Sequence, residues 1–146
     1  MEEKKTPQTW YLGITHVLTA SFIFPFIIGF AFVYLFVPIL APVVGELAFS
    51  VLNSIVSVAA LWIGVIYSSK FIHSRYNIRD SRQLVRLSTI IVGVLTFGSV
   101  LLSIVISANA TITQVQYDMI SGLFDATTAV VLVGVFYYTS KRMFLQ

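Results

Sequence analysis

Two pairs of polar residues are the side chains of this sequence best placed to do chemistry inside apolar segments. Glu46 and Asn53 are seven residues apart, and so are Asp118 and Asp125. Seven residues are close to two helical turns, so each pair lies on one face of a helix. Glu46 and Asp118 lie near predicted helix starts, where the helix dipole stabilises a carboxylate. Asn53 and Asp125 lie two turns deeper.

Asp125 is the first residue to consider as a functional group. It lies roughly 12 Å inside the outer end of its apolar segment, estimated from the helical rise. An unpaired carboxylate at that depth costs several kcal/mol, so it must be protonated, hydrogen-bonded or hydrated. Asn53, Ser57, Thr128 and the hydroxyl groups of the third span are candidate partners. One interpretation is a proton or cation site in an outward-facing cavity, and the other is a neutral Asp that fixes helix packing.

Four long apolar segments must position these side chains. Hydrophobic residues make up 58% and charged residues 10% of the 146 residues, and the mean hydropathy is +0.91. A soluble chain this short cannot bury so much apolar surface. The segments cover about 10–36, 44–69, 84–108 and 117–139, and each is long enough to cross a bilayer. We predict an all-α integral membrane protein, a four-transmembrane-helix bundle that forms a single transmembrane domain over residues 1–146.

The basic residues predict the orientation of these spans. All nine lie at the N-terminus, between the second and third spans, or at the C-terminus: Lys4, Lys5, Lys70, Arg75, Arg79, Arg82, Arg86, Lys141 and Arg142. The other two connections have none. The positive-inside rule therefore predicts a multi-pass protein of the cell membrane with both termini and the loop 70–83 in the cytoplasm. The first span is too long for a signal-peptide core, so we expect a retained anchor.

The basic connection between the second and third spans is a candidate binding surface. Arg75, Arg79, Arg82 and Arg86 can attract anionic lipid headgroups, each by on the order of 1 kcal/mol, or an acidic protein partner. The alternative is that they determine topology alone. The sequence from Asp80 to Gln83 resembles a capping box, which predicts a helix start at Asp80 and divides the arginines into two groups.

Two features of the first span stand apart from this pattern. Pro25 lies mid-span and lacks a backbone donor, which predicts a bend or local opening of the helix. His16 lies near the inner end, and His73 lies in the basic connection. Two histidines on one side could ligate haem or a metal, but no spacing motif supports this. We predict no metal site and no cofactor.

The two halves of the chain resemble each other. The sequence IGVIYSSK at 63–70 is similar to VGVFYYTSK at 133–141, which indicates two duplicated helical hairpins. The alternative is that inner helix ends share aromatic residues and a lysine for generic reasons. Small and hydroxyl residues form stripes on the last three spans. We expect these stripes to face one another, with the phenylalanines of the first span toward lipid or a subunit contact.

The remaining observations exclude several functions and leave three. There are no cysteines, no nucleophile–base pair is evident, and the loops are too short for a catalytic domain. A net charge of +3 does not indicate nucleic acid. The first hypothesis is a non-enzymatic subunit that acts through helix packing in the lipid bilayer, as a homo-oligomer or with other membrane subunits. The second is a transporter or channel for a small solute, proton or cation that uses Asp125 and Asn53. The third is a membrane enzyme or lipid-binding sensor.

Overall fold

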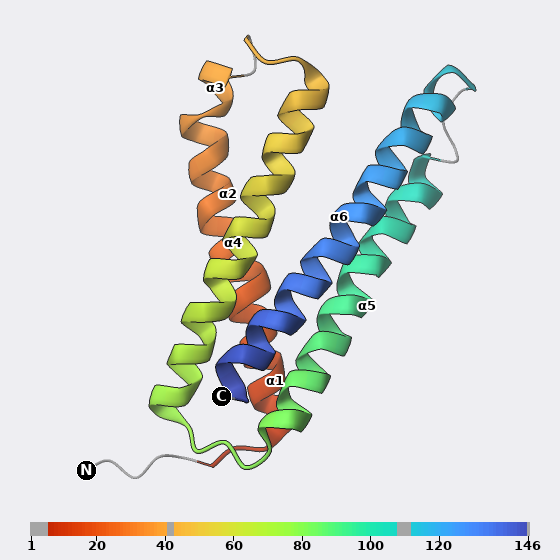
Figure 1. The fold of residues 1–146 in the computed structure, drawn as a ribbon. Coiled ribbons are helices and arrows are strands. Elements are labelled where there is room, and N and C mark those ends of the chain that lie inside the picture. Colours follow the sequence, from red (N-terminus) through yellow and green to blue (C-terminus); the bar gives the residue numbers. More distant parts are fainter. Residues whose placement is uncertain (1–5, 41–42, 108–111, 146) are drawn as a thin grey trace.

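A computed structural model describes residues 6–40, 43–107 and 112–145, without the side chains of 46–47, 103, 106–107 and 112–123. The described residues form helices and no strand. In chain order the helices are α1 (Thr9–Leu18), the π-helical turn η1 (Thr19–Ile23), α2 (Phe24–Leu35), α3 (Val37–Leu40), α4 (Glu46–Arg75), α5 (Ser81–Ser107) and α6 (Ile112–Phe144). The elements α1, η1 and α2 are continuous and together form one long rod (Figure 1).

Three segments of the described chain are long and apolar enough to cross a membrane. They are Thr9–Leu35, Ala48–Arg75 and Ser81–Leu102, with mean hydropathies of 2.0 to 2.1. The predicted all-α class is confirmed for the described residues, because they form helices and no strand. The predicted fourth span, 117–139, lies within the helix α6, but part of it falls on residues without described side chains.

The predicted cytoplasmic connection 70–83 is helical at both of its ends. The helix α4 continues to Arg75 and α5 begins at Ser81. Hydropathy marks where apolar residues stop, whereas polar residues can still extend a helix beyond that point. The predicted start at Asp80 is confirmed, because the backbone N–H of Gln83 donates to Asp80 Oδ1 at 2.9 Å.

The local opening expected at Pro25 is present one turn earlier, at η1. The N–H of Phe24 donates to the carbonyl of Thr19, a bond of π-helical spacing. In that spacing the carbonyl of Ala20 would need the N–H of Pro25, which does not exist. This carbonyl is instead directed at Gly64 of α4, in a contact so close that any side chain at position 64 would clash with it. The proline thus accounts for a carbonyl that is free to face Gly64, where η1 and α4 are in close contact.

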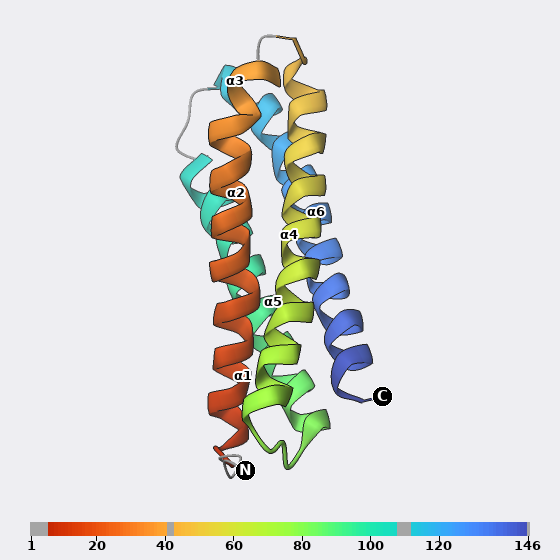
Figure 2. The ribbon, with the colours of Figure 1, turned by 90° about the vertical axis from the view of Figure 1, so that its left-hand side faces the viewer.

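The helices form two hairpins that meet at one end and diverge at the other (Figure 1). The rod α1–η1–α2 pairs with α4, and α5 pairs with α6; α1 also contacts α5, and α4 contacts α6. The described ends of the chain and the turn between α4 and α5 lie together at the joined end, and the view from the side shows the same arrangement (Figure 2).

We call residues 9–23, 60–92 and 132–145 the closed half, and residues 24–40, 43–59, 93–107 and 112–131 the open half. Both buried apolar clusters lie in the closed half. One contains Val17, Ala20, Leu61, Val65, Val92 and Phe136, and the other contains Leu12, Ile72, Leu84, Val85 and Phe144. Each cluster takes residues from both hairpins. The hydrophobic core that joins the hairpins is therefore confined, in the described part of the chain, to the closed half.

Candidate functional site

A histidine at the centre of the closed half joins both hairpins through hydrogen bonds. The His16 side chain of α1 is fully buried. Its Nδ1 lies 2.8 Å from Ser68 Oγ of α4, and its Nε2 lies 3.0 Å from Ser140 Oγ of α6. Residues 52 and 124 positions away in the sequence are thereby connected through one ring. We call His16, Ser68 and Ser140 the histidine clamp.

One arrangement of protons satisfies every polar atom of this clamp. Ser68 Oγ–H donates to the backbone carbonyl of His16 at 3.2 Å, which leaves the Ser68 oxygen to accept from Nδ1–H. Ser140 Oγ–H then donates to Nε2. A neutral imidazole thus completes the network with no ion and no water, which suits a buried position.

Aromatic rings enclose the histidine clamp. The His16 ring lies 5.1 Å from the ring centroids of both Phe136 and Phe144. Phe144 also contacts the exposed His73, whose ring stacks on it at 5.0 Å and whose Nε2–H donates to the carbonyl of Met143 at 3.1 Å. The end of α6 is therefore held between two histidines, and Phe144 closes the clamp from the end of the molecule.

The sequence held one signal for this clamp. Ser68 and Ser140 occupy the two similar runs toward the ends of α4 and α6, and His16 lies in the last turn of α1. A lone histidine has no spacing pattern, however, and the pairing depends on which helix faces meet across the bundle. The structure supplies that information.

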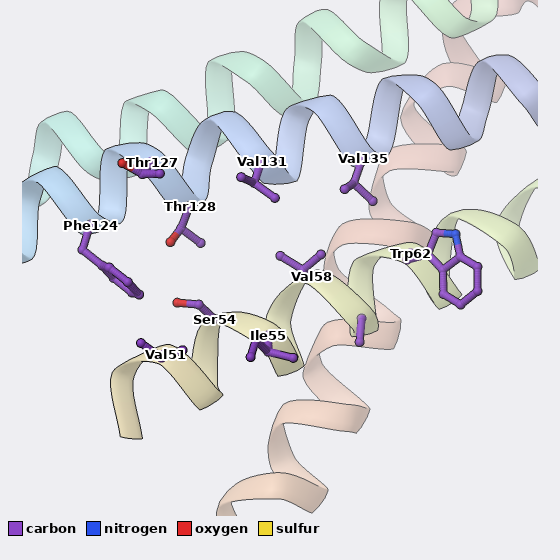
Figure 3. A pocket seen from close by; sticks show the side chains of 11 residues that line it. Val51, Ser54, Ile55, Val58, Trp62, Phe124, Thr127, Thr128, Val131 and Val135 are labelled. Atoms are coloured by element: carbon purple, nitrogen blue, oxygen red, sulfur yellow. The ribbon is translucent and has the colours of Figure 1, made fainter. Parts of the chain in front are cut away.

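In the open half, α4 and α6 border a tapering apolar cleft, which we call the wedge. Its volume is about 630 Å³, and its lining residues are Val51, Ser54, Ile55, Val58, Ala59, Trp62, Phe124, Thr127, Thr128, Val131 and Val135. Figure 3 shows Val58 of α4 directed toward α6, and Val131 directed toward α4. Trp62 and Val135 line the end of the wedge that reaches into the closed half. No charged residue lines the wedge in the described chain.

Asp125 lies in a second hollow of about 310 Å³, between α5 and α6. Thr96, Ser99, Val100, Thr128, Ala129 and Leu132 complete its lining. The carboxylate is exposed, and no described residue forms an ion pair with it. Thr96 lies six residues before the end of the apolar segment of α5, about 9 Å along the axis. The hollow therefore lies at the level of the apolar segments, and Thr128 lines both it and the wedge.

The other predicted polar residues do not gather around Asp125. Asn53 is exposed on α4 and lines neither hollow, and Ser57 Oγ–H donates to the Asn53 carbonyl at 2.9 Å. Of the proposed partners, the structure brings Thr128 and the third-span hydroxyls of Thr96 and Ser99 into the same hollow as Asp125, but not Asn53 or Ser57. The side chains of Glu46 and Asp118 lie outside the described residues.

The small-residue stripe of α4 does not face the second hairpin as expected. Gly64 packs against Ala20 and Phe24 of the first hairpin. The face that α4 turns toward α6 in the open half is instead the one with Ser54 and Val58. The prediction was wrong for α4, because hydroxyl and small residues alone do not say which neighbour a helix face meets. The stripes of α5 and α6 do meet, since Thr96 lines the same hollow as Asp125 and Ala129.

The predicted basic surface lies at the joined end of the hairpins. Arg75 ends α4 and its guanidinium lies 5.2 Å above the Phe71 ring, while Arg79, Arg82 and Arg86 are exposed. At the end of α6, the Lys141 ammonium lies 5.8 Å from the Tyr137 ring centroid. The described residues contain no group of three or more metal-ligating side chains. No protein family model, curated protein or solved structure matches this chain.

Proposed function

We propose that this chain is a four-span membrane protein with both termini in the cytoplasm, and that it acts without catalysis by packing against other membrane-embedded chains. Support for the membrane location comes from the three apolar segments. Support for the orientation comes from the basic residues: all those in the described chain lie near the joined end of the hairpins.

The packing role is supported by how little of each apolar helix is buried within the chain and by the exposed aromatic face of α2. Only 17 to 22% of each apolar segment is buried within the chain. In the open half, the main packing of α2 is against α4, and its outer face carries a ladder of exposed rings. The centroids of Phe26 and Phe30 are 6.2 Å apart, and those of Phe30 and Tyr34 are 4.2 Å apart. A self-sufficient bundle packs all its helices along their length, so this ladder is the face we assign to a neighbouring chain.

Crosslinking through single cysteines tests this function, because the natural chain has none. In native membranes, Phe30→Cys is expected to form a crosslinked dimer or a stoichiometric adduct with another membrane protein. Val130→Cys, exposed on α6 away from the ladder, is the matched control and should crosslink several-fold less. Purification in mild detergent then identifies the adduct. A chain that stays monomeric and gives no adduct from Phe30→Cys would contradict the packing role.

A second candidate is a path for protons or small cations, and the hollow around Asp125 favours it. The carboxylate lies at membrane depth beside the hydroxyls of Thr96, Ser99 and Thr128, and every described basic side chain belongs to the other end of the molecule. Such a carboxylate must take its counter-charge from a proton or a bound cation.

Flux through proteoliposomes tests this candidate. Asp125→Asn keeps the shape of the side chain and removes its charge, so it should abolish proton or cation flux while leaving the melting temperature near that of the natural protein. Asp80→Asn, at the joined end, is the control and should leave the flux unchanged. Equal flux in the natural protein and in Asp125→Asn would exclude a role of this carboxylate in transport.

A further inference from the structure

The joined end of the hairpins carries a positive charge that the described chain does not neutralise. Seven described basic side chains lie near this end, and Asp80 is the one described carboxylate there. Asp80 is already engaged as the cap of α5, where it accepts from the N–H of Gln83. None of the seven basic side chains forms an ion pair with a described carboxylate. A cluster of like charges without counter-charges attracts anions from its surroundings.

Two of these basic side chains, Arg82 and Arg86, lie on one face of a well-anchored helix. They are four residues apart at the start of α5, so they are neighbours on the helix surface, and both are exposed. Leu84 and Val85, between them, are buried in an apolar cluster of the closed half. Burial of these two residues fixes the rotation of α5 here, so the structure holds the two arginines side by side on its outer face.

The packing of α1 on α5 gives the level of this arginine pair. A methyl group added at Gly13 of α1 would lie 3.6 Å from Ser88 Oγ of α5, and both helices run away from the joined end (Figure 1). Trp10, three residues before Gly13, therefore lies at a level between Arg82 and Arg86. Trp10 is 55% exposed, and exposed tryptophans of membrane proteins gather at the headgroup level. The arginine pair is thus expected at the level of the lipid headgroups.

The type of the basic residues in this connection points to a phosphate. Every basic residue from Arg75 to Arg86 is an arginine, whereas the basic residues Lys4, Lys5 and Lys141 near the chain ends are lysines. Membrane orientation is favoured equally by lysine and arginine. A guanidinium can donate two parallel hydrogen bonds to one phosphate, and an ammonium cannot. Phosphate binding therefore explains the use of arginine, which orientation alone does not.

We propose that Arg82 and Arg86 bind the phosphate of an anionic phospholipid headgroup in the cytoplasmic leaflet. Such a lipid supplies both a phosphate at this level and the negative charge that the joined end lacks. A lipid is favoured over an acidic protein segment because Arg86 lies five residues, about 7.5 Å, inside the apolar segment that begins at Ser81. The proposal rests on the membrane location and orientation proposed above, and it is independent of the packing role of α2.

Native mass spectrometry in mild detergent, with equal amounts of phosphatidylglycerol and phosphatidylcholine, tests this proposal. The natural protein should retain one phosphatidylglycerol. Replacing both Arg82→Gln and Arg86→Gln should lower the retained fraction at least about ten-fold, since each arginine near an anionic lipid contributes roughly five-fold in affinity. The matched control, Lys141→Gln with Arg142→Gln, removes the same charge from exposed positions of α6 and should change retention less than about two-fold. Circular dichroism verifies that each variant is folded.

Two further measurements separate a phosphate site from a general attraction of charge. Arg82→Lys with Arg86→Lys keeps the charge, and hence the orientation, but removes the paired donors of the guanidinium, so it should lower retention at least about three-fold. Excess inorganic phosphate should leave phosphatidylglycerol bound, because the lipid is also held by its tails in the apolar surroundings.

Several results would overturn the proposal. Equal retention of the two lipids by the natural protein, or equal losses in the glutamine variant and its control, would show that Arg82 and Arg86 form no specific site. A lysine variant that binds as the natural protein does would reduce the effect to diffuse charge. Displacement by inorganic phosphate would assign the pair to a soluble anion, and an acidic protein lost only from the glutamine variant would assign it to a protein partner. Recovery of the chain from cells without detergent would instead refute the proposed membrane location, so the two proposals can fail separately.

Discussion

The closed and open halves are built from the same helices but are held together in different ways. In the closed half, the hairpins share two apolar clusters and the histidine clamp. In the open half, α4 and α6 are separated by the wedge, and the apolar side chains between them remain partly exposed. The same helix is thus tightly packed at one end and partly exposed at the other.

In the membrane location proposed above, this difference has a physical origin. Lipid is as apolar as leucine, so apolar residues alone give little reason for helices to associate. Close approach needs small residues, and specific association needs polar groups that lipid cannot satisfy. The closed half has both, in Gly64 and in His16 with its two serines. In the open half, a methyl group added at Gly93 or Gly98 would meet no atom of another helix within 4 Å, so these glycines allow no comparable approach.

The largest expected effect comes from Gly64, which faces the Ala20 carbonyl. Gly64→Ala places a methyl group against the Ala20 carbonyl and 3.0 Å from Phe24 Cβ, so α4 must move away from η1. We expect a loss of about 3 kcal/mol in the free energy of unfolding, the upper part of the usual cost of overpacking. Gly98→Ala, exposed in the open half, should be neutral or stabilising by up to about 1 kcal/mol. Thermal unfolding in detergent compares the two, and similar losses would contradict the contrast between the halves.

The next effect is loss of the histidine clamp. His16→Leu leaves the buried Ser140 hydroxyl without its acceptor and the Ser68 oxygen without its donor, although Ser68 Oγ–H keeps the backbone carbonyl of residue 16; we expect a cost of about 2 kcal/mol. Adding Ser68→Ala and Ser140→Ala removes those unsatisfied groups and should recover more than half of the loss in thermal unfolding. If the triple variant is as unstable as the sum of its single changes, the three side chains do not act as one network.

The smallest expected losses of stability come from shortening two valines of α4, one in each half. Val65 is fully buried in the closed half, and Val65→Ala should cost about 1–2 kcal/mol through the cavity it leaves. Val58 lines the wedge, where lipid or detergent can fill the space, so Val58→Ala should cost less than about 0.5 kcal/mol. Equal losses, measured by thermal unfolding, would mean that the open half is packed as tightly as the closed half.

The helical class could be predicted from the sequence because the bilayer imposes a simple rule on the length of apolar segments. Two local features could also be predicted from the sequence: Asp80 caps α5, and the helix opens at the turn before Pro25. Each of these predictions depends on neighbours in the sequence. The duplication of the two hairpins stays a prediction, because a shared arrangement of two helices does not by itself show a common origin.

The candidate site could be predicted only in part. Asp125 can be identified because a carboxylate in an apolar segment is conspicuous, but Asn53 lies outside its hollow. The role of His16 could not be predicted, because its partners are 52 and 124 residues away. The position of Asn53 and the partners of His16 both depend on how each helix is rotated about its axis, which the sequence does not give. The small-residue stripe of α4 is an example. Its small residues Ala60 and Gly64 lie in the closed half, and Gly64 packs on the first hairpin, because η1 directs a backbone carbonyl there.

The most direct test of the closed and open halves is the distance between α4 and α6 at two levels, measured by pulsed electron paramagnetic resonance in lipid nanodiscs. Spin labels at Lys70 and Tyr138 report on the closed half, and labels at Asn53 and Val130 report on the open half; all four positions are exposed. The structure predicts a narrow distance distribution for the first pair and a longer, broader one for the second. Two narrow distributions of similar mean distance would contradict the divergence of the hairpins and, with it, the existence of the wedge.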